Sequence, residues 1–174
     1  MRYIRFLCAL FAVALLALPA WAANTCAGVQ VGPHDRYAAS NVRLRAWQST
    51  YSTAYTTLPR GQRVVQQGVA AEWTHVYVPS LQMTGYVATR FLTPNCVAGR
   101  QIARADLRTK EVVDILINDS MARYGGPCPC PYNTDRAGRR CGLRSAYTRP
   151  GGAAPLCYPG DVPKELVEHF REGA

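Results

Sequence analysis

The residues with the strongest capacity for chemistry lie in one short segment, from Tyr124 to Tyr158. It contains four cysteines: Cys128, Cys130, Cys141 and Cys157. Four thiolates can bind zinc, but structural zinc sites typically place about two to four residues between paired cysteines. Here the spacers hold one, ten and fifteen residues, and the one-residue spacer would strain a Cys128–Cys130 bridge. The spacing therefore predicts disulfides from Cys128 and Cys130 to Cys141 and Cys157, in either of two pairings, and no metal or cofactor.

Arginines give the same segment its charge. From Met121 to Gly160 there are six arginines and one acidic residue, Asp135. An arginine-rich surface favours anionic partners, which predicts an anionic ligand at this segment. The alternative is a solvated basic surface in which some arginines pair with Asp135. The predicted binding residues of this segment are Arg139, Arg140, Arg144 and Tyr147.

Catalysis is a second interpretation of these residues. A hydrolase of nucleic acid or wall polymer would be built around Asp135, Arg139, Arg140 and Tyr147. A glycosidase, however, needs two positioned carboxylates, and Asp135 is the single acid of the segment. A cysteine peptidase needs a free thiolate beside a base, and a metallo-amidase needs clustered histidines, whereas the three histidines are scattered along the chain. We therefore expect a binding protein rather than an enzyme, with the hydrolase as the alternative.

The first 22 residues have the pattern of a secretory signal peptide. Two arginines precede an apolar run, and Ala20-Trp21-Ala22 forms a small-x-small cleavage site. The run is shorter than the roughly 20 residues that a membrane span needs. We therefore expect cleavage near Ala22, a periplasmic or secreted protein, and no membrane span afterwards. Cleavage removes Cys8 and both arginines, which leaves six cysteines for disulfides and lowers the formal net charge from +9 to +7.

Short strand-like runs follow the signal region. They alternate or are β-branched, and turn residues separate them. Closing such strands into a small barrel removes sheet edges that a small domain cannot cover. Cys26 and Cys96 lie on either side of this region, where a disulfide would clamp the ends of the barrel together. The predicted strands include residues 42–45, 62–67, 73–78 and 85–88.

Five groups of residues follow one another along this region in a recognisable order. They are Val42-x-Leu44-Arg45-Ala46-x-x-Ser49, Leu58-Pro59-x-Gly61 with Val64-Val65, Trp73-x-x-Val76, Gly85-Tyr86-Val87 and Phe91-Leu92. With these spacings, residues 41–93 resemble a bacterial SH3 domain. The resemblance implies binding to peptidoglycan or an envelope protein, and not catalysis. It also implies that Trp73 lies in the core, since the family buries an aromatic residue in that strand.

One position departs from the pattern of that family. Trp47-Gln48 stand where the family usually has Gly-Pro, which places an aromatic side chain at the first long loop, residues 48–56. Trp47 either contacts a ligand or packs on the C-terminal half of the chain. Tyrosines among hydroxyl residues offer flat apolar faces with polar edges, which suit sugars or peptides. The predicted ligand-binding residues of the barrel are therefore Trp47, Tyr51 and Tyr55.

The C-terminal half changes to helical periodicity. A helix is expected over residues 109–124, with Thr109 as its N-cap and Gly125-Gly126 at its end. Its apolar stripe should pack on the barrel or on the cysteine-rich loops. Residues 161–170 predict a short second helix that docks back. The predicted stripe consists of Val113, Leu116, Ile117, Met121 and Tyr124.

These patterns together predict an α+β protein that is mainly β in its first half. Its expected parts are a signal peptide (1–22), an SH3-like barrel clamped by Cys26–Cys96 (23–98), and a helix with a disulfide-stapled, loop-rich basic module (99–174). The C-terminal half contains the pieces Tyr124-x-Gly126-x-Cys128-Pro129-Cys130-Pro131-Tyr132-Asn133, Arg139-Arg140-Cys141-Gly142 and Pro155-Leu156-Cys157-Tyr158. With these pieces, residues 114–162 are similar to a cysteine-rich segment of other small exported bacterial proteins, which implies a portable module without assigned chemistry. The expected function is non-catalytic binding in the bacterial envelope. A partner-specific inhibitor or adaptor is a further alternative, and the oligomeric state is left open.

Overall fold

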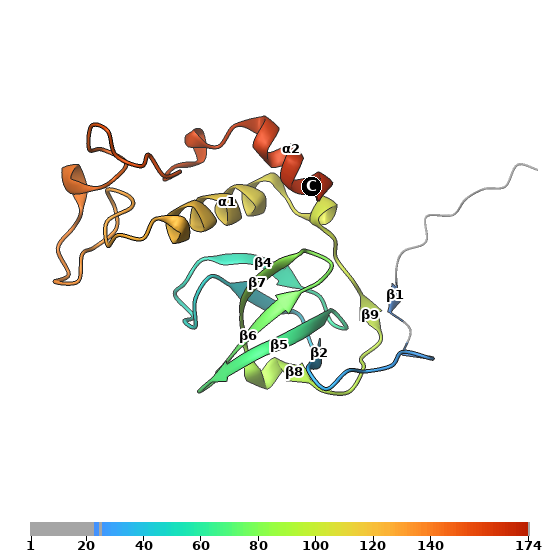
Figure 1. Ribbon diagram of the computed structural model, residues 1–174. Helices are drawn as coiled ribbons and strands as arrows, with labels where there is room; N and C mark the ends of the chain where they lie inside the picture. Colours follow the sequence, from blue (N-terminus) through green and yellow to red (C-terminus); the bar gives the residue numbers. More distant parts are fainter. Residues whose placement is uncertain (1–22, 25, 174) are drawn as a thin grey trace, which may run out of the picture.

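The computed structural model describes residues 23–24 and 26–173, so the predicted signal peptide lies outside the described residues. Seven antiparallel strands form one curled sheet in the order β4-β3-β7-β6-β5-β2-β8 (Figure 1). Since β4 and β8 are its two edges, the sheet is a half-barrel that curls without closing. The predicted α+β class, mainly β in the first half, is confirmed. The strands are β2 (Asp35–Ala38), β3 (Val42–Arg45), β4 (Ala54–Leu58), β5 (Arg63–Ala70), β6 (Trp73–Val78), β7 (Met83–Ala88) and β8 (Leu92–Thr93).

The alternation of β6 decides which side chains face the core. Thr74, Val76 and Val78 are buried, whereas Trp73, His75 and Tyr77 lie on the opposite face and are only partly buried. The prediction that Trp73 is a core residue is therefore wrong. Successive strand residues point to opposite faces, so assigning one aromatic residue to the wrong face reverses the whole strand.

A strap after the sheet connects it to the helices. It includes β9 (Gly99–Arg100), which pairs with β1 (Ala23–Asn24). The strap passes so close to the β4–β5 turn that a Cβ on Gly99 would collide with the carbonyl oxygen of Arg60. The buried amide of Gln62 holds the next residues: its Oε1 accepts from the backbone N–H of Ile102 at 2.8 Å. The strap is thus fastened to the sheet by backbone contact and by one buried side chain.

Helix α1 (Thr109–Arg123) begins where the sequence predicts, but its cap is different. Arg108 is the N-cap residue, and its backbone N–H donates to Oε2 of Glu111 at 2.9 Å. The prediction that Thr109 is the N-cap is therefore wrong, because Thr109 is already helical. Its hydroxyl instead accepts a hydrogen bond at 2.9 Å from Arg171 of helix α2 (Lys164–Glu172). The carboxylate at the third helical position thus satisfies the N–H group of the N-cap residue itself, and no side-chain hydroxyl caps the first turn.

Helix α1 packs against β4 and α2, as well as the turn before α2. Val112 and Ile115 are buried in the same apolar cluster as the side chains of the sheet. Of the predicted stripe, Ile117 is buried, whereas Val113 and Leu116 are only partly buried. The predicted stripe is wrong in part because a helix packed on more than one side does not bury a single row of residues. No helix of the described chain is both long and apolar enough to cross a membrane.

Three disulfides staple the described chain. The predicted Cys26–Cys96 bridge is present, with Cα atoms 5.7 Å apart. The other two are Cys128–Cys141 and Cys130–Cys157, each with Cα atoms 5.6 Å apart, which is one of the two pairings that the sequence leaves open. The predicted disulfides are therefore confirmed, and they indicate an oxidising extracellular or periplasmic compartment.

Candidate functional site

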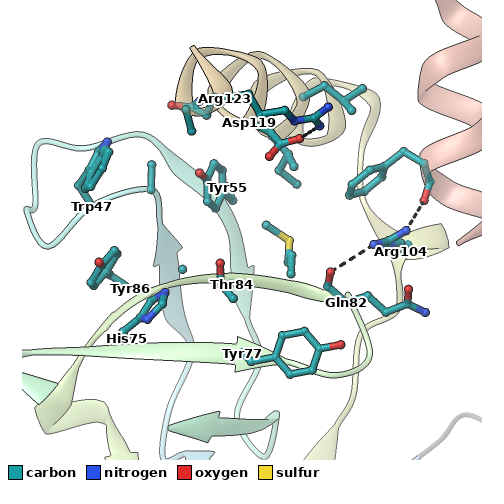
Figure 2. Close-up of a pocket in the computed structure, with 18 of the residues that line it drawn as sticks. Trp47, Tyr55, His75, Tyr77, Gln82, Thr84, Tyr86, Arg104, Asp119 and Arg123 are labelled. Carbon is teal, nitrogen blue, oxygen red and sulfur yellow. Dashed lines mark hydrogen bonds and ion pairs between the residues drawn. The ribbon is translucent and has the colours of Figure 1, made fainter. Parts of the chain in front are cut away.

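An open groove of about 670 Å³ lies between the sheet and the two helices (Figure 2). Side chains of β6 and β7 form its floor, α1 supplies one wall, and the end of α2 supplies another. The volume falls in the range of small-ligand pockets, which is roughly 300–1,000 Å³. The side chains on its floor are His75, Tyr77, Thr84 and Tyr86.

Three aromatic rings form a stack along this groove. His75 and Tyr86 are directly opposite each other on β6 and β7, and their ring centroids are 4.8 Å apart with an interplanar angle of 28°. The indole of Trp47 continues the stack, 6.5 Å from Tyr86 at 20°. Trp47 is 64% exposed, so one large aromatic surface remains open to solvent. It stacks on Tyr86 of the sheet and is not buried against the C-terminal half of the chain.

The loop that carries Trp47 is tied down by its own hydroxyl and amide groups. The Ser52 hydroxyl donates to the carbonyl of Trp47 at 2.9 Å, and the guanidinium of Arg45 donates to the carbonyl of Ser52 at 2.7 Å. The backbone N–H of Ala46 donates to Thr53 at 3.0 Å. The backbone that carries the indole is therefore held in place before any ligand arrives, which reduces the entropy that ordering the loop would cost on binding.

Charged groups line the helical side of the groove. Asp119 and Arg123 form an ion pair on α1 (Figure 2). Burial raises the pKa of Tyr55, and the nearby carboxylate of Asp119 raises it further. Across the groove, Arg104 donates to the carbonyls of Leu81 at 2.7 Å, Gln82 at 3.3 Å and Phe170 at 3.4 Å. Within the described chain Arg104 has no carboxylate partner, and its guanidinium also lies over the ring of Phe170, 4.6 Å from the centroid, so carbonyl dipoles and an aromatic face together balance its positive charge.

The three predicted ligand-binding residues of the first half have different positions. Trp47 and Tyr55 both line the groove, although Tyr55 belongs to β4 and not to the expected loop. Tyr51 is 99% exposed at the loop and does not line the groove. His75 and Tyr86 are not among the binding residues predicted from the sequence. The signal that identifies them is the alternation of β6, which puts His75 on the outer face, together with an aromatic residue at the paired position of β7.

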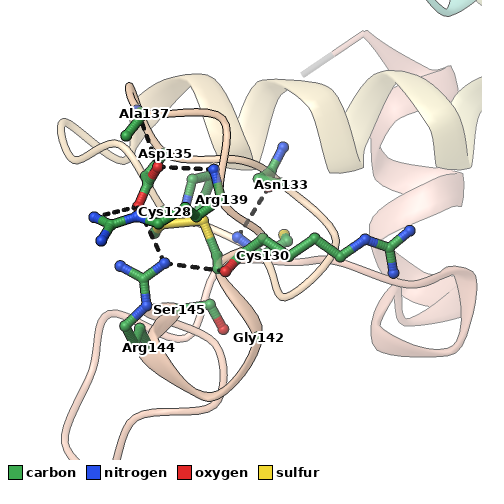
Figure 3. Close-up of a disulfide and its surroundings, with 12 residues drawn as sticks. Cys128, Cys130, Asn133, Asp135, Ala137, Arg139, Gly142, Arg144 and Ser145 are labelled. Atoms are coloured by element: carbon green, nitrogen blue, oxygen red, sulfur yellow. Dashed lines mark hydrogen bonds and ion pairs between the residues drawn. A yellow bond between two sulfur atoms is a disulfide. The ribbon is translucent and has the colours of Figure 1, made fainter.

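The cysteine-rich module contains a second polar cluster, centred on Asp135 (Figure 3). Its carboxylate accepts hydrogen bonds at 3.0 Å from the backbone N–H groups of Ala137 and Arg139. The guanidinium groups of Arg139 and Arg144 donate to it at 3.0 and 3.1 Å. These donors lower the pKa of Asp135 to about 2, the backbone N–H of Arg139 contributing most. Such a carboxylate is a poor general base, since catalysis favours a pKa near the working pH.

The remaining predicted residues of the module do not join this cluster. The guanidinium of Arg140 makes no ion pair within the described chain and is exposed. The Tyr147 hydroxyl donates to Asp161 at 3.0 Å, and this hydrogen bond raises the pKa of Tyr147. The ring of Tyr147 packs edge-on against Tyr158, with centroids 5.5 Å apart. Arg139 and Arg144 are therefore brought together by Asp135, whereas Arg140 and Tyr147 have separate surroundings.

Nothing in either place forms a metal centre. Among the described residues, no group of three or more histidine, cysteine, aspartate or glutamate side chains is placed to hold a metal ion. The six cysteines of the described chain are all in disulfides, so none of them offers a thiolate. The groove can therefore bind a ligand by stacking and hydrogen bonding, and the module can offer positive charge.

Comparisons of the chain with protein-family models, with curated proteins and with solved structures found no match. The arrangement of the groove is therefore the main basis for a function.

Proposed function

We propose that this chain is an exported, non-catalytic binding protein of the bacterial cell envelope. Its SH3-like module, residues 41–93, binds peptidoglycan or an envelope protein through the groove. The observation that carries the proposal is the open stack of Trp47, Tyr86 and His75 beside walls in which charged side chains alternate with apolar ones. Flat aromatic faces with polar edges fit sugar rings and peptide groups, which present the same mixture of apolar and polar surface.

The test is retention of the mature protein on purified peptidoglycan sacculi. Trp47→Ala removes an indole that is 64% exposed, so the fold should persist while the affinity falls about fivefold. Tyr51→Ala is the matched control: Tyr51 is an aromatic residue on the same loop that is 99% exposed and lies outside the groove.

Three results are informative. Weakened retention of Trp47→Ala with unchanged retention of Tyr51→Ala supports peptidoglycan binding in the groove. Equal retention of both variants and the wild type would show that the groove is not the wall-binding site. Absence of wild-type retention at low salt removes the peptidoglycan version and leaves an envelope protein as the partner, to be sought with Trp47→Ala as the negative control.

A further inference from the structure

A second surface lies in the loops of the cysteine-rich module, residues 131–149, which we call the basic loops. Between residues 125 and 160 the chain has five arginines and one acidic residue, Asp135. Asp135 is shared by Arg139 and Arg144, whose side chains remain 73% and 51% exposed. Arg136 and Arg140 are exposed and have no ion-pair partner within the described chain. The basic loops thus hold positive charge well in excess of what their own acid compensates.

An exposed leucine lies among these arginines. Leu143 is 84% exposed, on a short 3-10 turn between Arg140 and Arg144. The Cys128–Cys141 disulfide anchors the start of that turn, and the backbone N–H of Gly142 donates to Pro131 at 2.9 Å. These restraints fix the backbone of the turn in the conformation that leaves Leu143 exposed. Burial of an apolar side chain at a partner surface would be favourable.

The position of the basic loops leaves them accessible. They lie beyond the C-terminal end of α1, away from the curled sheet (Figure 1). The backbone N–H of Leu156 donates to the Ser120 hydroxyl of α1 at 2.9 Å, and the Tyr132 hydroxyl contacts the sulfur of Met121 at 3.4 Å. The cysteine-rich module is therefore attached to α1 at Leu156 and Tyr132, and the basic loops project beyond these attachments.

We propose that the basic loops dock the protein onto a membrane surface that contains anionic phospholipids. The arginines contact lipid phosphates, and Leu143 enters the boundary between headgroups and acyl chains. Basic residues attract a protein to an anionic surface, and an inserted apolar side chain adds to this attraction. Tyr132, Tyr147 and Tyr158 are 41%, 37% and 42% exposed, and tyrosine is a residue type that suits such a boundary.

A soluble polyanion such as nucleic acid explains only part of these observations. It would account for the arginines, because phosphate contacts depend on positive charge. It gives no role to a leucine that is held outward beside them. Leu143 therefore favours a lipid surface and also provides the discriminating experiment.

The test is co-sedimentation of the mature, oxidised protein with vesicles of phosphatidylglycerol and phosphatidylcholine in equal amounts, compared with pure phosphatidylcholine. Binding is expected only to the anionic vesicles, and it should weaken as salt is raised. The double variant Arg136→Ala, Arg140→Ala removes two exposed guanidinium groups without ion-pair partners and should weaken binding roughly 25-fold, at about fivefold for each arginine. Leu143→Ser should weaken it about tenfold.

Matched controls come from the sheet. Arg43→Ala removes an exposed arginine of β3, and Val69→Ser removes an apolar side chain of β5 that is 54% exposed. Neither should change vesicle binding, and Trp47→Ala should not change it either, which separates this surface from the groove. Equal binding to both vesicle types overturns the proposal, as do effects of the controls that match those of the loop variants. Tight binding of duplex DNA with no effect of Leu143→Ser on vesicles assigns the loops to soluble polyanions instead.

Discussion

Gln62 gives the sharpest test of how the sheet is joined to the helices. Its buried NH2 group has two hydrogens to donate and lies within hydrogen-bonding distance of three acceptors, the carbonyl of Arg63 at 3.2 Å and the side-chain oxygens of Ser80 and Gln101 at 3.0 Å each. Its oxygen accepts from the backbone N–H of Ile102 at 2.8 Å. Gln62→Leu keeps the size of the side chain and removes the two hydrogen bonds that the NH2 group can donate and the one that Oε1 accepts, so it isolates their contribution to stability.

The expected loss of stability follows from the polar groups that Gln62→Leu leaves without a hydrogen-bond partner. The buried N–H of Ile102 loses its acceptor, which costs roughly 1–3 kcal/mol, and each of the two hydrogen bonds donated by the NH2 group costs roughly 0.5–1.5 kcal/mol when lost. The apolar surface of the buried leucine offsets about 1.5 kcal/mol of this loss. We therefore expect Gln62→Leu to lower the free energy of unfolding by about 3 kcal/mol, or the melting temperature by roughly 6–12 °C.

The assay is urea unfolding of the oxidised chain from Ala23 onward, followed by tryptophan fluorescence. Gln67→Leu is the control, because Gln67 is an exposed glutamine of β5 whose side chain makes no hydrogen bond within the described chain. Its free energy of unfolding should stay within about 0.5 kcal/mol of the wild type. If the two variants are equally stable, the Gln62 network does not fasten the strap, and the reasoning is refuted.

Two further predictions concern the disulfides and Asp135. Replacing both cysteines of Cys26–Cys96 by serine should lower the free energy of unfolding by about 4 kcal/mol. The same change at Cys128–Cys141 should lower it by about 3 kcal/mol, because that disulfide closes a shorter loop. Calorimetry that gave the reverse order would contradict this entropic account. The carboxyl of Asp135, whose pKa is lowered to about 2, should titrate near that pH by NMR. Its stabilising contacts should be complete above the unfolded pKa of about 3.9 and be lost as the pH falls through about 2, whereas a midpoint near 3.9 would mean that its hydrogen bonds do not persist in solution.

The cysteine pattern shows what a sequence can and cannot determine. The signal-peptide pattern and the spacing of the cysteines can both be read from short stretches of the sequence. The first predicts disulfides, and the second excludes a Cys128–Cys130 bridge. The choice between the two remaining pairings depends on how the intervening loops fold. The N–H groups of Cys141 and Gly142 donate to Asn133 and Pro131, both at 2.9 Å, which places Cys141 beside its partner. Such loop contacts have no periodicity that a sequence could reveal.

Strand β4 could not be predicted from the sequence, for a different reason. Its residues, Ala54–Leu58, are rich in hydroxyl groups and look like the end of a polar loop. They form a strand because they pair with β3, with Leu58 opposite Val42 and Thr56 opposite Leu44. Strand preference depends strongly on such neighbours. Tyr55 consequently reaches the groove from a rigid strand, although it was expected on a loop.

Helix α1 fixes the two proposed surfaces relative to each other. Asp119 and Arg123 line the groove, while Ser120 between them accepts the hydrogen bond from Leu156 at the base of the cysteine-rich loops. One helical turn therefore supports both surfaces. The helix has 15 residues and is about 22 Å long. If the basic loops dock at a membrane, the groove must open within roughly one helix length of that surface, where a ligand that is itself close to the membrane would be within reach.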